Sequence, residues 1–271
     1  ALTKAEERIA KLLEEEAADQ VAEEIDNLPS VDDLTIEDKS AVESAKAHYD
    51  ALDDDQKDRV EEQKPGSAEK LDKLVERMEE LKAAAADQEA ADKVSEKLNA
   101  LPSVEDVMLA SEEEIKAARE AYDALTEAQQ GKVSEEAKAK LTDAEAKLSE
   151  LQNQMKNVED LIGALPGTGE ITLAHEDQIK AARDAYDALN NEQKNKLTED
   201  GTLSKLLEAE NQLTHVKNNA EAAKKAEDRI NSLPNPGDLK MSDKSRVEAA
   251  RDAYDALTDE QKDLIPKDTY D

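Results

Sequence analysis

Several residue types are missing from this chain, and their absence limits its possible folds. The sequence has no cysteine, phenylalanine or tryptophan, and only seven of its 271 residues are glycine. Without cysteine there are no disulfide bonds, no thiolate nucleophiles and no thiolate metal ligands, and the redox compartment stays open. The aromatic content of 2% and the few glycines argue against β-sheets. No run of 18 apolar residues occurs, so the sequence predicts no membrane-spanning helix.

Positive charge is also scarce. The chain has 68 acidic and 36 basic side chains, which give a formal net charge of −32. This sign excludes general nucleic-acid binding and disfavours anionic membrane surfaces. It favours solubility and mutual repulsion between molecules.

One pattern occurs four times along the chain. Each copy has a Leu-Pro pair, a tyrosine twenty residues after the proline, and a glutamine seven residues after the tyrosine. The tyrosines are 73, 64 and 68 residues apart. The members are Leu28-Pro29, Tyr49 and Gln56; Leu101-Pro102, Tyr122 and Gln129; Leu165-Pro166, Tyr186 and Gln193; and Leu233-Pro234, Tyr254 and Gln261. A repeat of nearly constant length is typical of rods and binding arrays rather than of enzymes with one active site.

The residues leading to each tyrosine predict a short amphipathic helix. In the first copy Val42, Ala45, Tyr49 and Leu52 form one apolar stripe, and the other copies keep this spacing. We expect this helix to have about 16 residues. A capping-box pattern follows each stripe and predicts a turn into another short helix. These patterns are Asp53-x-x-Gln56, Thr126-x-x-Gln129, Asn190-x-x-Gln193 and Thr258-x-x-Gln261.

Long segments with few helix breakers separate these short helices. Residues 67–101 and 202–233 contain no glycine and no proline, and residues 134–165 contain one glycine, Gly163. Apolar residues alternate in steps of three and four from Leu141 to Leu165, as in a coiled-coil seam. We expect each segment to be the last helix of one repeat fused to the first helix of the next, ending at the Leu-Pro pair.

These expectations define an all-α fold, an elongated rod of tandem three-helix-bundle repeats joined by continuous helices, with spectrin-like connectivity. The predicted repeats are residues 1–66, 67–133, 134–201 and 202–271, with each long helix shared by neighbouring bundles. Residues 1–6 resemble the internal stretch 141–145, so we expect the chain to be an excerpt of a longer protein with any targeting signals outside it.

Candidate chemistry is sparse, and we expect no catalytic, cofactor-binding or metal-binding residues. His48, His175 and His215 occupy non-equivalent repeat positions. The run 53–55 of three aspartates lacks the glycine and glutamate of an EF-hand loop, so a helix cap with solvated carboxylates is the favoured interpretation. Each repeated tyrosine lies within an apolar stripe, which favours a core position over a partner-binding anchor.

Two stretches carry a resemblance to a known group of proteins. Residues 116–126, KAAREAYDALT, and residues 249–262, AARDAYDALTDEQK, resemble tandem helical repeats of large surface proteins of Gram-positive bacteria. The first copy departs from this core with His48 before Tyr49. Such proteins are secreted and often attached to the cell wall, and they include stalks, adhesins and immunoglobulin-binding, superantigen-like members.

The resemblance implies a non-enzymatic, extracellular repeat region. Our leading hypothesis is a rod that binds a host protein, with immunoglobulin as the first candidate, because repeated modules multiply weak contacts. The alternative is a passive stalk that displays another adhesive domain. Neither hypothesis involves a cofactor, a small-molecule substrate, nucleic acid or insertion into a membrane, and partner-binding residues are not assigned.

Overall fold

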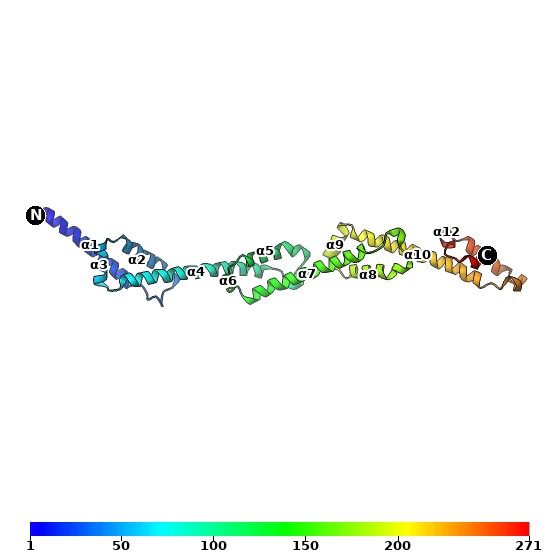
Figure 1. The fold of residues 1–271 in the computed structure, drawn as a ribbon, viewed down its shortest axis with the longest axis horizontal. Coiled ribbons are helices and arrows are strands. Elements are labelled where there is room, and N and C mark those ends of the chain that lie inside the picture. The colour runs from blue at the N-terminus through cyan, green and yellow to red at the C-terminus, as the bar shows by residue number, and fades with distance from the viewer. Residues whose placement is uncertain (271) are drawn as a thin grey trace. The chain divides into compact units, whose positions relative to one another are not determined.

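The structure is a computed structural model that describes residues 1–270. Every regular element in this range is helical, and no strand occurs among these residues, so the predicted all-α class is confirmed. Four long helices alternate with shorter ones along the chain (Figure 1). The long helices are α1 (Leu2–Asp26), α4 (Ser67–Ala100), α7 (Glu135–Gly163) and α10 (Thr202–Asn231).

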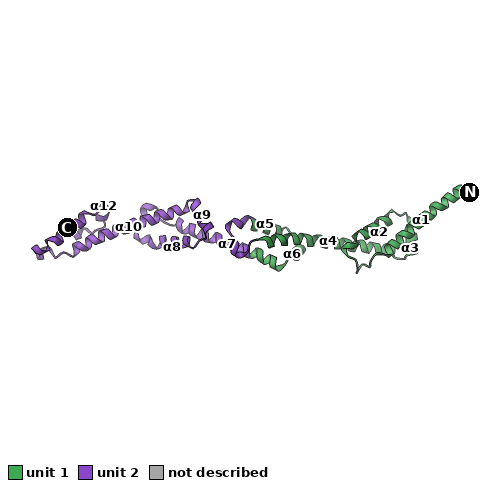
Figure 2. Ribbon diagram, turned by 180° about the vertical axis from the view of Figure 1, so that it is seen from behind, with its two compact units in different colours: residues 1–101, 114–142 green, residues 102–113, 143–271 purple. Residues whose placement is uncertain are grey.

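The helices group into two compact units (Figure 2). The first unit contains residues 1–101 and 114–142, and the second contains residues 102–113 and the residues from 143 onward. Helix α7 has residues in both units, because the division falls after Thr142. The division into four repeats stays a prediction.

Each long helix ends just before its Leu-Pro pair, as the sequence predicted. Helix α4 ends at Ala100, and the N–H of Leu101 donates to the carbonyl oxygen of Leu98. Proline lacks the N–H needed to continue the helix and disfavours helical geometry in the residue before it. The leucines of the first three pairs, Leu28, Leu101 and Leu165, are buried, so each helix end is also fixed by packing.

The predicted seam of α7 is confirmed. The helix runs without a break through Leu148–Ile162. All eight seam positions from 141 to 165 are buried: Leu141, Ala144, Leu148, Leu151, Met155, Val158, Ile162 and Leu165. Alternating steps of three and four residues keep side chains on one face of a helix, so this face is covered along its whole length.

The helices that carry the tyrosines are shorter than predicted. They are α2 (Lys39–Ala51), α5 (Glu112–Asp123), α8 (Glu176–Asp187) and α11 (Lys244–Asp255), of 13, 12, 12 and 12 residues. The expected length of about 16 is wrong, because a 3-10 turn precedes each helix. In the first such turn the N–H of Thr35 donates to the carboxylate of Asp38 at 2.9 Å.

The helices that follow the capping boxes have two lengths. Helices α3 (Asp54–Gln63) and α9 (Asn191–Glu199) have 10 and 9 residues, whereas α6 (Glu127–Gln130) and α12 (Asp259–Lys262) have 4 each. The two longer helices are followed by Gly66 and Gly201, whose φ angles are 87° and 84°. Glycine adopts this left-handed geometry without steric cost, which allows a sharp turn into α4 and α10.

A hydrophobic cluster lies where α1, α2, α3 and α4 pack together, and we call it the N-terminal core. Its most deeply buried members include Ile25, Val42, Leu71, Leu74 and Met78. A smaller C-terminal cluster contains Ala223, Ala226 and Ile265, with Tyr254 and Tyr270 packed against it beside the last helix, α13 (Lys267–Tyr270). Among residues 1–270, none of the helices combines the length and the hydrophobicity that a membrane span requires.

Candidate functional site

The four capping boxes are all formed. In each, the glutamine side-chain oxygen accepts from the N–H of the cap residue, and the cap side chain accepts from the glutamine N–H. At Asp53 and Gln56 the two bonds are 3.0 and 2.8 Å long. Asp53 therefore acts as a helix cap, as predicted, and Asp54 and Asp55 lie in the first turn of α3, where carboxylates favour the positive end of the helix dipole.

The same glutamines also bond to the preceding long helix, which the sequence analysis did not foresee. Each side-chain nitrogen donates to a group 42 residues earlier in the chain. The acceptors are the carbonyl oxygens of Glu14 and Leu151 and the side-chain oxygens of Asp87 and Asn219. The glutamine amide thus caps one helix with its oxygen and fastens that helix to another with its nitrogen. The sequence held one signal of this contact, which is that the residue is glutamine in all four copies. Glutamate could accept the N–H of the cap residue equally well, but it has no amide N–H to donate to another helix.

A second repeated contact ties the start of each later long helix to the end of the preceding one. The Lys70 ammonium donates to the carbonyl oxygens of Asp26 and Leu28 at 3.0 and 2.9 Å. Lys140 and Lys205 donate in the same way to Asn99 and Gly163 at 2.6 and 2.8 Å. Carbonyls at a helix C-terminus lack intrahelical partners and carry partial negative charge, so a lysine is well suited to them.

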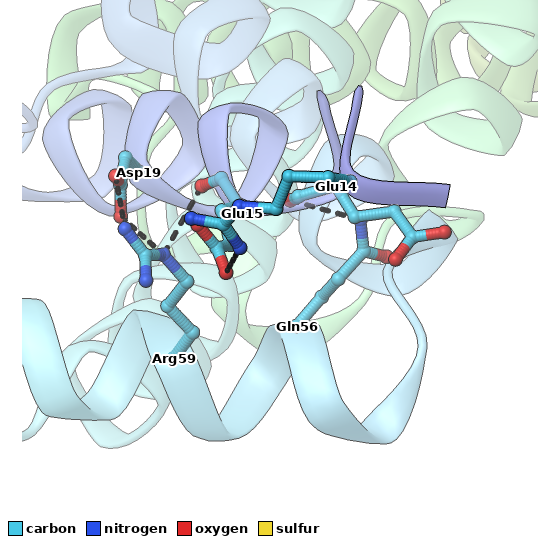
Figure 3. Close-up of polar contacts among 6 residues, drawn as sticks. Glu14, Glu15, Asp19, Gln56 and Arg59 are labelled. Carbon is cyan, nitrogen blue, oxygen red and sulfur yellow. Dashed lines mark hydrogen bonds and ion pairs between the residues drawn. The ribbon is translucent and has the colours of Figure 1, made fainter. Parts of the chain in front are cut away.

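A polar site in the first unit joins α3 to α1 (Figure 3). Arg59 on α3 makes a two-point ion pair with Asp19 on α1, with distances of 2.8 Å from Nε and 2.6 Å from Nη2. Its Nε also donates to the carbonyl oxygen of Glu15 at 3.2 Å. The hydrogen bond to Asp19 raises the pKa of Arg59 above its usual value, because it stabilises the charged guanidinium.

A groove of about 570 Å³ lies beside this ion pair, between α1 and α3. Its lining is predominantly acidic, with Lys11 and Arg59 as its basic members. The acidic lining residues are Glu7, Glu14, Glu15, Asp53, Asp55, Asp58 and Glu62. No group of side chains in residues 1–270 has the arrangement needed to hold a metal ion. The groove can therefore offer carboxylates to a basic surface, and its walls are held by the Arg59 and Gln56 contacts.

The repeated tyrosines lie at the edge of the apolar packing. Tyr186 is buried, whereas Tyr49, Tyr122 and Tyr254 are half-buried. A cationic group lies over each ring, at distances such as 5.8 Å from Lys57 to Tyr49 and 5.3 Å from Arg183 to Tyr186. Burial raises the pKa of Tyr49. A tyrosine packed on one side and covered by a cation on the other fits the predicted core position, with the hydroxyl at the edge.

The three histidines lie in three different settings. His48 Nδ1 is 2.7 Å from the Glu24 carboxylate. His175 Nδ1 accepts from the N–H of Thr172 at 3.0 Å and so caps the turn before α8, in the place that Asp38 takes before α2. His215 Nε2 lies 3.9 Å from Glu260. Each imidazole therefore has a different polar neighbour.

The polar contacts described above share one consequence: they hold short helices onto long ones. No buried side-chain polar atom among residues 1–270 lacks a hydrogen-bond partner. Comparison with known proteins found no match to the chain among protein-family models, curated protein sequences or solved structures.

Proposed function

We propose that this chain is a non-enzymatic segment of a bacterial cell-surface protein, built as an elongated rod of tandem three-helix repeats. The observation that carries the proposal is the recurrence of the glutamine contact across a constant 42 residues in all four copies of the pattern. A contact repeated at fixed spacing serves the cohesion of a repeat, whereas a catalytic site is formed once. The continuous helix α7 and its covered seam support coupling between neighbouring repeats.

Small-angle X-ray scattering tests the rod. A compact domain of 271 residues has a radius of gyration of roughly 19 Å. We expect a radius at least twice this value and a pair-distance distribution with a long tail. A radius close to that of a compact domain would contradict the rod.

We further propose that the rod binds a host protein extracellularly, with immunoglobulin as the first candidate from the sequence resemblance. The acidic groove between α1 and α3 is a candidate surface for such a contact, because its carboxylates complement a basic partner face. Affinity purification from serum with the intact chain tests this, and an unrelated acidic protein of equal net charge is the reference. We expect immunoglobulin to be enriched over this reference.

Two triple charge-reversal variants test whether the partner binds in this groove. Replacing Glu7, Asp58 and Glu62 in the groove by lysine should abolish recovery of the partner. Replacing the exposed Asp72, Glu76 and Glu120 by lysine changes the net charge equally and should preserve it. Equal loss in both triple variants would mean that binding depends only on net charge and would contradict a specific site.

A passive spacer is the second candidate function. The observation in its favour is that the polar residues described above engage one another across helices, and that each repeated tyrosine is covered by a cation. Aromatic anchors that dominate protein interfaces are therefore not freely presented. Failure to enrich any serum protein, together with an elongated scattering profile, would favour this function.

A further inference from the structure

The turn that precedes each tyrosine helix is closed by one side chain, and the type of this side chain differs among the four copies. It lies eleven residues before the repeated tyrosine in every copy. It accepts from the backbone N–H three residues earlier, at 2.9 Å for Asp38, 3.2 Å for Ser111, 3.0 Å for His175 and 3.1 Å for Asp243. Among these four residues, His175 is the one whose acceptor atom can take up a proton near neutral pH.

The geometry of the closed turn fixes the protonation state of His175. The backbone N–H of Thr172 can only donate, so Nδ1 of His175 is the acceptor and carries no proton. The hydroxyl oxygen of Thr172 lies 3.3 Å from the same nitrogen. The imidazole is therefore neutral, with its proton on Nε2. When a second proton binds Nδ1, both ring nitrogens become donors and the N–H of Thr172 loses its acceptor.

The contact of His48 makes the opposite demand on the imidazole. Its Nδ1 lies 2.7 Å from the carboxylate of Glu24. An ionised carboxylate only accepts hydrogen bonds, so this nitrogen donates and keeps its proton whether the ring is neutral or charged. Protonation of His48 therefore leaves the bond in place and makes it a bond between opposite charges. Acid preserves the contact of His48 and removes that of His175.

The turn packs against α8 and α10, so the charged groups on these helices surround it. The titratable side chains next to the turn on these helices, and in the 3-10 turn before it, are Glu170, Glu176, Asp177, His215, Lys217 and Glu221. Glu176 pairs with Lys217. Among ordinary side chains, histidine is the one whose charge changes between pH 7 and 5. The other histidine, His215, has its Nε2 3.9 Å from Glu260 of α12, so its protonation acts on a different contact.

We propose that His175 is a pH-sensitive cap: the turn before α8 is closed at neutral pH and opens when a proton from solvent binds Nδ1, whereas the turns closed by Asp38, Ser111 and Asp243 stay closed. His175 is half-buried, so solvent reaches the ring. It is also the N-cap residue of α8, where the helix dipole disfavours a positive charge. Mild acid thereby loosens the connection from α7 into α8 at one copy of the pattern. This inference goes beyond the proposed function and depends on no host ligand.

Hydrogen exchange of the intact chain at about pH 7 and pH 5 tests the cap, with each measured rate divided by the intrinsic rate at that pH. We expect the protection of residues 172–176 to fall about fivefold or more at the lower pH, as for the loss of a helix cap. The turns before α2 and α11 are internal controls, because Asp38 and Asp243 make the same bond with a carboxylate. Their protection should change less than about twofold. An equal fall in all three turns would overturn the proposal.

Variants separate the effect of the proton from that of the side chain itself. His175→Asp introduces the acceptor of the first and fourth copies, so it should keep the protection at both pH values and remove the pH dependence. His175→Ala should lower the protection at both, and His48→Ala should leave the response of the turn before α8 unchanged. NMR of the imidazole nitrogens at neutral pH should show Nδ1 unprotonated in His175 and protonated in His48. A pH dependence that survives in His175→Asp, or a proton on Nδ1 of His175 at neutral pH, would each contradict the cap.

Discussion

The N-terminal core and the C-terminal cluster are built from the same sequence pattern but differ in burial. Val42 is 1% exposed and Val247 is 37% exposed, although both lie seven residues before a repeated tyrosine in helices of nearly equal length. Their capping boxes and helix ends are also alike. In the N-terminal core α4 packs beside α1 and α2, and Val42 shares one hydrophobic cluster with Leu71, Leu74 and Met78 of α4. Local structure therefore follows from local sequence here, and burial follows from the number of helices that meet.

The largest effect should come from breaking the covered seam of α7. Asn153→Pro removes a helical hydrogen bond and introduces a clash, at a cost of about 3 kcal/mol or more. We expect loss of amide protection on both sides of residue 153 in hydrogen exchange. Ala10→Pro in the exposed part of α1 is the comparison, and it should leave protection of the N-terminal core unchanged. Equal loss of protection in both variants would contradict a special role for the seam.

Truncation of core leucines should be nearly as costly. Leu74 is 0% exposed, so Leu74→Ala should lower the free energy of unfolding by about 3 kcal/mol through lost burial and a cavity. Ile9→Ala, at a residue that is 59% exposed, should change it by less than about 0.5 kcal/mol. Urea unfolding followed by circular dichroism measures both. A large effect at Ile9 would show that this side chain is packed against the protein rather than exposed.

The cost of removing the glutamine should differ between a buried and a half-buried copy of the pattern. Gln193 is 0% exposed and donates to the carbonyl of Leu151 at 2.8 Å, so Gln193→Ala should cost about 2 kcal/mol by removing a cap and leaving a buried carbonyl unpaired. Gln261 is half-buried, and Gln261→Ala should cost about 1 kcal/mol. Gln193→Glu keeps the cap oxygen but replaces the amide donor by a carboxylate oxygen at a buried site, so its cost combines the lost bond with the burial of a charge. If this variant were as stable as the unmodified chain, the bond would contribute nothing.

Substitutions at Gly66 and Gly131 compare a turn that needs a left-handed backbone with a turn of ordinary backbone geometry. Gly66 has a φ of 87° and no atom within 4 Å of an added Cβ, so Gly66→Ala should cost about 1 kcal/mol from backbone strain alone. Gly131 has a φ of −62°, where alanine is not strained, and Gly131→Ala should be neutral within about 0.5 kcal/mol. Chemical denaturation of the two variants decides between strain and local packing.

The smallest effect concerns acid titration of the turn before α2. The bond from the Thr35 N–H lowers the pKa of Asp38 below its usual 3.8. A carboxyl group with a depressed folded pKa stabilises the protein above the unfolded value, and this contribution is lost as the pH falls through the folded value. Asp38→Asn should therefore reduce the loss of stability between pH 4 and lower pH, measured by denaturation at each pH. If the stability of the variant depended on pH as that of the unmodified chain does, the carboxylate charge of Asp38 would contribute nothing to stability in this turn.

Several structural features could be read from residues close together in the chain. The capping boxes, the ends of the long helices and the seam of α7 each depend on residues within a few turns of one another, and each is confirmed. The predicted length of the tyrosine helices is wrong because a 3-10 turn precedes each helix, and in the first copy this turn follows Thr35. An apolar stripe does not distinguish a 3-10 turn from an α-helical turn. No partner site could be assigned from the sequence, and the groove between α1 and α3 could not be found from either helix alone.

By itself, the sequence determined the helical class, the positions of the caps and the stripes that seek burial, because propensity, capping and periodicity act over short distances. The tertiary structure alone decided which groups meet across about 42 residues: the glutamine amide with the long helix, Lys70 with the end of α1, and Arg59 with Asp19. It also decided that Met78 is buried while Ile9 is exposed. The physical reason is that burial and polar pairing depend on the neighbouring helices present, which no local pattern specifies.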